Sequence, residues 1–334
     1  LKYLLLALLI SSGLMAQVQV GSPILGAASG DYFGENTAIN GNGTIVAGFA
    51  VNHDSNKGHV RVFLHTPTGN ASWTQMGDDI DGESASDNGN IENGSNNIAL
   101  NLAGNILAFG SVNDDGTATN AGHVRVFQFI SGSWTQMGSD IDGEAQSDNL
   151  GVSVALSDDG HTIVIGANEH DDGGNSQTGA IYVYTWNGSA WVQKGSSLHG
   201  VANDLFGNDV SINSDGSIIA GSSRRNSSNK GQVKIFQYNS SATNSWTLIG
   251  SILGEATGDY SGASISLNNS GHIIAIGATN NSGANGSASG HARVYQYTPT
   301  GTSSWTQLGA DIDGESSSDY FGDAVSLSAD GFTL

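Results

Sequence analysis

Five of the 6 tryptophans recur at nearly regular intervals, and similar sequence surrounds each of them; they are Trp73, Trp134, Trp191, Trp246 and Trp305. Residues 72–84 read SWTQMGDDIDGES, residues 133–145 read SWTQMGSDIDGEA, and residues 304–316 read SWTQLGADIDGES. A period of roughly 60 residues indicates a repeat architecture, in which each unit packs only against its neighbours.

Each repeat contains segments that alternate apolar and polar residues over the length of a short strand. The third repeat is the clearest: strands A, B, C and D are predicted over residues 151–157, 161–167, 179–186 and 190–195. Asp-Gly and Asn-Gly pairs between them supply the positive φ that tight hairpins need. The chain has 48 glycines and 3 prolines, and no helix-period apolar stripe follows the N-terminus, so the fold class is all-β.

Four-stranded sheets that cannot bury both faces alone must pack on their neighbours, and a ring of sheets achieves this without long free edges. We therefore predict a β-propeller of four-stranded antiparallel blades, since a β-solenoid would have a shorter period. The blades are predicted over residues 21–77, 78–138, 139–195, 196–250 and 251–309, with a partial sixth blade at 310–334. The half blade suggests a truncated chain from a six- or seven-bladed ring, with further domains beyond residue 334.

The N-terminus is predicted to be a signal peptide over residues 1–16. Lys2 gives a short positive region, residues 4–10 form an apolar run too short to span a bilayer, and small residues precede a cleavage point after Ala16. The propeller domain is then 17–334. Its first residues, 17–26, align with residues 73–82, which predicts an extra strand D that closes the ring.

The chain is strongly acidic, with 31 acidic and 10 basic residues and a formal net charge of −21. This charge repels nucleic acid and anionic membranes and favours cations. There is no cysteine, which excludes a disulfide framework, a thiolate metal site and a cysteine nucleophile. Most of the acids are predicted on one face of the ring, where the B–C loops and the D–A connections between blades lie.

Several short motifs resemble the FG-GAP repeats of integrin-α-type propellers and their bacterial relatives. The FG step stands at residues 33–34, 206–207 and 321–322, and the GA step at residues 166–167 and 277–278. The resemblance implies a ligand-binding propeller outside the cell. In that family a calcium loop joins strands A and B, but these turns here hold at most two carboxylates, whereas Ca²⁺ takes six to eight oxygens. The family's calcium sites are therefore not expected in these turns.

The DIDGE segments are predicted to be D–A connections, and two interpretations stay open. Either Ile80, Ile141 and Ile312 plug the space between blades while the carboxylates face water, or the carboxylates bind hard cations, with Ca²⁺ as the candidate cofactor. The candidate metal ligands are Asp81, Glu83, Asp87, Asp142, Glu144, Asp148, Asp313, Glu315 and Asp319.

The B–C loops vary in length and content, as exposed recognition loops do. Most of them are polar and acidic, and the loop at residues 223–230 is basic. The candidate ligand-binding residues in these loops are Asp54, Asp114, Asp115, Glu169, His170, Asp171, Asp172, Arg224 and Arg225.

Basic residues recur inside strand C, where a charge between packed blades needs a partner. They are Arg61, Arg125, Lys234 and Arg293. We expect each to pair with an acid of a D–A connection, such as Asp87 or Asp148. Histidines recur at the start of the same strand, at His59, His123 and His291, and this recurrence favours a structural role over catalysis.

These features predict an exported binding or adhesion module, secreted or at the cell surface, that recognises an extracellular protein or glycan. The alternative is a structural spacer that displays other domains of a larger protein. A hydrolase is less favoured, because no Gly-x-Ser-x-Gly elbow, no HExxH helix and no separate carboxylate pair stands out. No nucleic acid partner and no membrane insertion after signal cleavage are expected.

Overall fold

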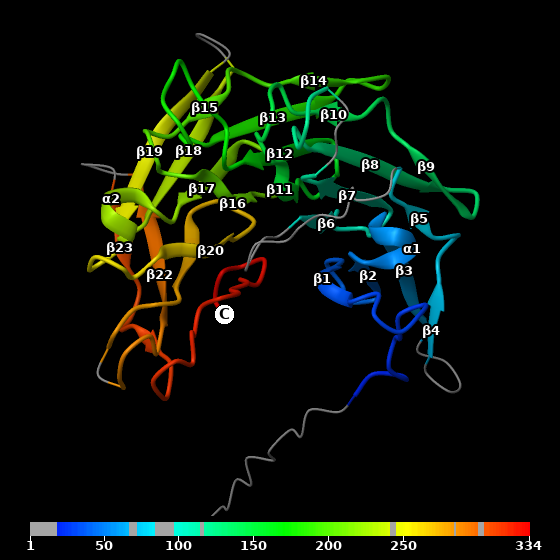
Figure 1. Ribbon diagram of the computed structural model, residues 1–334. Coiled ribbons are helices and arrows are strands. Elements are labelled where there is room, and N and C mark those ends of the chain that lie inside the picture. Colours follow the sequence, from blue (N-terminus) through cyan, green and yellow to red (C-terminus); the bar gives the residue numbers. More distant parts are fainter. Residues whose placement is uncertain are drawn as a thin grey trace, which may run out of the picture.

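The computed structural model describes residues 19–66, 72–83, 97–113, 117–240, 245–283, 285–299 and 304–334. Five antiparallel sheets follow one another along the chain and stand side by side in an arc (Figure 1). In each sheet the strands pair in the order A, B, C, D. The predicted all-β propeller with five four-stranded blades is confirmed. The predicted signal peptide lies outside the described residues.

Each blade is built from strands that are consecutive in the chain. The first blade contains β1 (Phe33–Ile39), β2 (Ile45–Ala50), β3 (His59–Thr66), β4 (Ser72–Gln75) and β5 (Ile80–Asp81). The second contains β6 (Ile98–Leu100), β7 (Ile106–Ser111), β8 (His123–Ile130), β9 (Ser133–Gln136) and β10 (Ile141–Asp142). The third contains β11 (Leu150–Leu156), β12 (Thr162–Ala167), β13 (Ala180–Trp186), β14 (Trp191–Gln193) and β15 (Leu198–His199). The fourth contains β16 (Phe206–Ile212), β17 (Ile218–Ser223), β18 (Gln232–Asn239) and β19 (Ser245–Leu253). The fifth contains β20 (Ser261–Leu267), β21 (Ile273–Ala278), β22 (His291–Thr298), β23 (Ser304–Gln307) and β24 (Ile312–Asp313). Two short helices, α1 (His53–Asn56) and α2 (Asn226–Asn229), lie in B–C loops.

Strand D differs from the prediction. Residues 80–81 do not belong to a connection between blades, because Ile80 pairs with Val60 and Asp81 with His59 of strand C. Strand D is therefore built in two parts, β4 and β5, around an irregular step. In the fourth blade β19 runs through the whole length, with a register shift at the same step. The D–A connection begins only after the DID sequence.

The hydrophobic core lies between blades rather than within them. Each of the four buried clusters combines residues of two adjacent blades; one joins Ile106 and Val124 of the second blade to Val154 and Ile163 of the third. Ile80 and Ile141, 7% and 6% exposed, are members of such clusters, as the first interpretation of the DIDGE segments predicted. For Ile312 the prediction is wrong, because this side chain is 44% exposed.

The recurring tryptophan links each blade to the one before it. The indole Nε1–H of Trp134 donates to Met76 O at 2.7 Å, and that of Trp191 donates to Met137 O at 2.8 Å. The tryptophans of the fourth and fifth blades do the same. A buried indole needs an acceptor, so one residue type recurs where each blade meets strand D of its neighbour.

The N-terminal segment contacts the first blade as strand D of one blade contacts the next. Trp73 Nε1 donates to Val20 O at 2.9 Å, and Arg61 NH1 donates to Leu25 O at 3.1 Å. In the predicted alignment Val20 and Leu25 correspond to Met76 and Asp81, whose carbonyls accept the equivalent bonds from the second blade. Residues 19–32 form no strand, but these contacts agree with the predicted alignment.

The A–B turns are joined around the ring by peptide groups. Gly41 N donates to Leu102 O at 3.0 Å, Leu102 N to Asp158 O at 3.2 Å, and Asp158 N to Ser214 O at 2.9 Å. The series continues to the last turn, where Asn269 N donates to Ala329 O at 3.0 Å. Backbone groups thus hold the turns that, in the resembled family, carry calcium loops.

Candidate functional site

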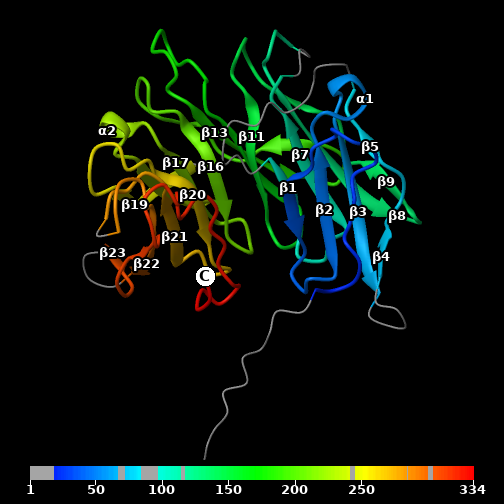
Figure 2. The same cartoon turned by 60° about the horizontal axis from the view of Figure 1, so that its bottom comes forward.

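The B–C loops and D–A connections share one face of the arc, on which α1 and α2 also lie (Figure 2). The A–B turns occupy the opposite face. Most of the predicted ligand and metal residues fall on the first face, which is therefore where a site must be sought.

A recurring aspartate closes each described D–A connection. Its carboxylate accepts the N–H of the residue three positions earlier: Asp31 from Ala28, Asp148 from Ala145, Asp204 from Val201, Asp259 from Ala256 and Asp319 from Ser316. Four of the five are less than 7% exposed, the exception being Asp319. Two of the predicted metal ligands, Asp148 and Asp319, therefore cap turns of the backbone.

A side chain from the following B–C loop faces each buried aspartate. It is the third residue after strand B: His53 faces Asp31, His170 faces Asp148, Asn226 faces Asp204 and Asn281 faces Asp259, at 3.0 to 3.3 Å. The pairing holds the B–C loop against the D–A connection. The recurring buried aspartates therefore have a structural role, which accounts for part of the repeated carboxylates on this face.

The basic residues of strand C are partnered as expected in two blades, but by different acids. Arg125 NH1 lies 3.6 Å from Glu83 Oε1, and Arg293 NH1 lies 3.1 Å from Glu255 Oε1, both across a blade boundary. Arg61 instead lies 3.4 Å from Asp79 of its own strand D. Asp148, suggested as a partner, pairs with His170, and Asp87 lies outside the described residues.

Lys234 contacts an aromatic ring: its Nζ lies 5.1 Å from the centre of the Phe206 ring. A cation over an aromatic face in a partly dehydrated setting is stabilised by the ring quadrupole.

The other predicted metal ligands lie along the outer part of the same face. Asp81, Asp142 and Asp313 stand opposite the recurring histidines His59, His123 and His291 in the strand register, with exposed side chains. Glu144 and Glu315 are exposed as well. The predicted sets do not gather among the described residues: no group of three ligand atoms combines Asp142, Glu144 and Asp148, or Asp313, Glu315 and Asp319. A cation at these carboxylates stays a prediction.

Three other groups bring a histidine and two further ligands together, with their atoms within 4.8 Å of one another. They are Asp31, His53 and His59; Glu83, His123 and Asp140; and Glu255, His291 and Asp311. One predicted ligand, Glu83, belongs to the second group. Sequence reasoning missed Asp31 and His53, although the repeat positions of both could have been read from the alignment of the blades.

His170 lies in the B–C loop of the third blade, between β12 and β13. His170 is 7% exposed, and its ring lies 5.2 Å from that of His199. Asp172 Oδ2 lies 3.9 Å from His199 Nδ1, and Asp171 Oδ1 accepts the N–H of Gln177 at 2.7 Å. Glu169 is half-buried.

Two other predicted ligand residues are outside this loop. Asp54 is exposed on α1 and lies 3.7 Å from Lys57 Nζ. Asp114 and Asp115 lie outside the described residues.

The His170–Asp148 pair predicts a pH-dependent contribution to stability. Asp148, 3.3 Å away, raises the pKa of His170 above 6.5, against the effect of burial. The unfolded chain has the ordinary value of about 6.5. The pair therefore stabilises the fold fully below that pH, and the stabilisation is lost as the pH rises through the folded-state pKa. We expect His170→Asn to lower the free energy of unfolding more at about pH 5.5 than at about pH 8.5 in chemical denaturation. An equal loss at both would contradict this linkage.

Arg224 and Arg225 line a hollow of about 550 Å³ on the same face. Its other lining residues come from the two following blades and include Tyr260, Asn280, Tyr320 and Asp323. Arg225 and Tyr320 are exposed, while Arg224 and Tyr260 are half-buried. The hollow thus combines two guanidinium groups, two phenol rings, one amide and one carboxylate, a donor-rich surface with flat apolar rings.

Comparison with known proteins supports the repeat. Residues 140–184, from the end of the second blade to strand C of the third, match the FG-GAP repeat family, which confirms the resemblance. A search of curated proteins found no match.

Solved structures with a similar arrangement are β-propellers of low identity. A proposed 6-phosphogluconolactonase from Bacteroides uniformis is 10% identical with a TM-score of 0.49, covering 85% of this chain and 86% of its own. A proposed TolB from Agrobacterium tumefaciens is 13% identical with a TM-score of 0.48, covering 90% and 87%. The periplasmic gluconolactonase PpgL of Pseudomonas aeruginosa is 12% identical with a TM-score of 0.43, covering 85% of both chains. Such low similarity gives no indication of activity.

Within the part of the chain that the structure describes, no helix has the length and hydrophobicity to cross a membrane.

Proposed function

We propose that this protein is an exported, non-catalytic β-propeller that binds acidic glycans, with the hollow around Arg224 and Arg225 as its binding site. The observation that carries the proposal is the convergence of Arg224, Arg225, Tyr260 and Tyr320 on one hollow, on a face that is otherwise rich in carboxylates. Two arginines in a chain with only 10 basic residues concentrate positive charge where an anionic group would be held.

The lining chemistry favours a sugar acid. A guanidinium group binds a planar carboxylate through two parallel hydrogen bonds, which an ammonium group does not reproduce. Phenol rings offer a flat apolar face with a polar edge, suited to a sugar ring that is apolar on its C–H faces. Thr279 and Asn280 add hydroxyl and amide groups for the sugar hydroxyls.

The volume of the hollow suits a small ligand, and its acid content favours binding over hydrolysis. About 550 Å³ lies within the usual range for small-ligand sites. Asp323 is the one carboxylate among its lining residues, whereas glycoside hydrolysis ordinarily uses a pair. The predicted signal peptide supports an extracellular setting, in which acidic polysaccharides and glycoproteins are accessible.

Substitution of Arg225 tests this function. We expect the full chain to bind uronic-acid oligosaccharides in titration calorimetry more tightly than neutral oligosaccharides of the same length. Arg225→Ala should weaken that binding about 10- to 100-fold, because it removes a charge-assisted hydrogen bond. The matched control is Lys57→Ala, which removes one partly exposed positive charge from another B–C loop of the same face.

Each result has a defined meaning. Equal weakening by both variants would show a general charge effect instead of a site, and absence of binding to acidic oligosaccharides would refute the proposal. Chromatography of the oligosaccharide after long incubation tests catalysis separately, since cleavage would contradict a non-catalytic role.

A further inference from the structure

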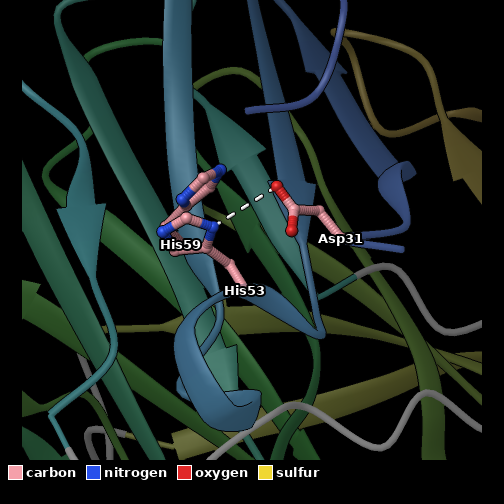
Figure 3. A group of neighbouring side chains, drawn as sticks. All are labelled: Asp31, His53 and His59. Carbon is pink, nitrogen blue, oxygen red and sulfur yellow. Dashed lines mark hydrogen bonds and ion pairs between the residues drawn. The ribbon is translucent and has the colours of Figure 1, made fainter. Parts of the chain in front are cut away.

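Three side chains from separate segments of the first blade meet on the B–C face (Figure 3). Asp31 lies in the segment before β1, His53 lies on α1, and His59 begins β3. His53 Nδ1 is 3.3 Å from Asp31 Oδ2, and the His53 and His59 ring centres are 3.9 Å apart. One ligand atom of each residue lies within 4.8 Å of the other two.

His59 has unmet bonding capacity in this group. Its side chain is 0% exposed, and neither ring nitrogen has a hydrogen-bond partner. A buried imidazole without a hydrogen-bond partner is costly unless a ligand uses one of its ring nitrogens.

Asp31 is held in place beside the two rings by the Ala28 amide and by His53. The carboxylate is oriented by Ala28 N at 2.7 Å and is only 6% exposed. Two imidazoles and one oriented carboxylate thus lie together in this group.

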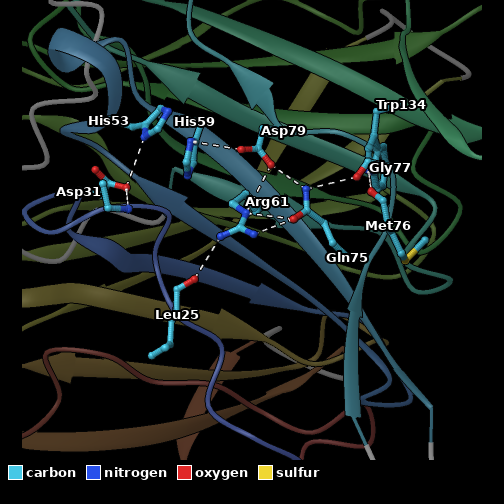
Figure 4. A network of polar contacts seen from close by, with 11 residues as sticks. Leu25, Asp31, His53, His59, Arg61, Gln75, Met76, Gly77, Asp79 and Trp134 are labelled. Atoms are coloured by element: carbon cyan, nitrogen blue, oxygen red, sulfur yellow. Dashed lines mark hydrogen bonds and ion pairs between the residues drawn. The ribbon is translucent and has the colours of Figure 1, made fainter.

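Asp79 supports His59 from its other side (Figure 4). Its Oδ2 lies 3.8 Å from His59 Nδ1, and its Oδ1 accepts Gln75 Nε2 at 2.6 Å. At this distance Asp79 makes no hydrogen bond to the ring, but a carboxylate beside one histidine nitrogen leaves the other nitrogen for a metal, an arrangement common around metal-binding histidines.

In other blades the residues at these positions make the same structural contacts without forming the full cluster of three. The third blade has the aspartate and histidine pair, Asp148 and His170, but Ala180 replaces the histidine that begins strand C. The fifth blade has Asp259 and His291, but Asn281 replaces His53. The turn and the loop contact therefore form without the full set. Among the blades that the structure describes at these positions, the first alone combines all three.

We propose that Asp31, His53 and His59 bind one divalent transition-metal ion of the Zn²⁺ class. Two nitrogen ligands and one oxygen ligand suit Zn²⁺ and its late first-row neighbours, whereas Ca²⁺ and Mg²⁺ prefer oxygen ligands alone. Metal–ligand bonds of about 2.0–2.2 Å require the three atoms to draw together, which rotation of the half-buried His53 on α1 allows. The ion would join the N-terminal segment, the B–C loop and strand C of the first blade, and would leave a fourth position for water.

Metal content and zinc titration of the full chain test the site. After removal of metal with a chelator, titration calorimetry with ZnCl₂ should show one tight site that CaCl₂ does not fill. His53→Asn and His59→Gln should abolish this site, and each introduces the residue that another blade carries at the same position, Asn281 and Gln232. His170→Asn, which alters the matching pair of the third blade, should leave it intact.

Thermal melts separate loss of the site from loss of the fold. Zinc should raise the melting temperature of the wild-type chain and of His170→Asn, because a ligand of the native state stabilises it. Without zinc, His53→Asn should melt close to the wild type, and zinc should not raise its melting temperature. The proposal is overturned if the wild type shows no tight zinc site, or if that site persists unchanged in both His53→Asn and His59→Gln.

Discussion

Gly166→Ala should lower the free energy of unfolding by about 3 kcal/mol or more, a large effect for the addition of one methyl group. A Cβ at Gly166 would collide with the carbonyl oxygen of Gly207 in the next blade and with Ser153 Oγ. Both obstacles are held in place, since Gly207 O accepts the Ser153 hydroxyl at 2.9 Å. The two blades would have to separate along their inner edge.

The same contact explains the FG and GA motifs in physical terms. The glycine of a GA step lies against the glycine of the next FG step, which has positive φ: Gly166 against Gly207, and Gly277 against Gly322. In the second and third blades Gly110 meets Gly151 in the same way. The motif is therefore a close approach of two backbones, which a side chain on either glycine would prevent.

Gly283→Ala is the matched control for this prediction. Its added Cβ would meet no atom closer than 3.5 Å, and its backbone does not need positive φ. Denaturant unfolding of both variants should show a shift in midpoint for Gly166→Ala alone. If both variants unfold like the wild type, the blades tolerate separation at this edge and the close-packing explanation is wrong.

The sequence was sufficient for the fold because the repeat is encoded locally. Strands predicted at 161–167 and 179–186 are observed as β12 (Thr162–Ala167) and β13 (Ala180–Trp186). Turn glycines and alternating residues are short-range signals, and several copies in register reinforce one another. The first part of the DIDGE segment was misassigned because its glycine and three acids resemble a turn. Only the pairing of Ile80 with Val60 shows an irregular step inside strand D.

The candidate sites could be predicted only in part, because they depend on contacts between segments that are distant in the sequence. The predicted carboxylates were found by their repetition, but Asp148 is occupied by the Ala145 amide and by His170. Asp31, His53 and His59 come from three segments, and each has counterparts elsewhere with a structural role. Their combination is visible only when the D–A turn and the B–C loop of one blade are placed together. Arg224 and Arg225 were predicted, whereas Tyr260 and Tyr320 were not, because strand geometry brings them to the hollow.

The second large effect on the free energy of unfolding is expected at a buried polar position near the start of strand A. Asp209 is 0% exposed, and its Oδ2 accepts the N–H of Ile265 in the next blade at 2.7 Å. Its Oδ1 accepts the N–H of Val210 at 2.9 Å. Asp209→Ala would leave both amides buried without these acceptors, so we expect a loss of about 3 kcal/mol in the free energy of unfolding, measured by denaturant titration.

The neighbouring blade supplies the conservative variant. Ser264 occupies the same repeat position, and its Oγ accepts the N–H of Val325 at 3.1 Å, as Asp209 does for Ile265. A serine hydroxyl can therefore serve this joint, and Asp209→Ser should recover a clear part of the stability that Asp209→Ala loses. If alanine and serine are equally destabilising, the carboxylate acts through its charge and not through the inter-blade hydrogen bond. If neither variant is destabilised, the strands A of adjacent blades are held by apolar packing alone, and the recurrence of polar residues at this position has no role in stability.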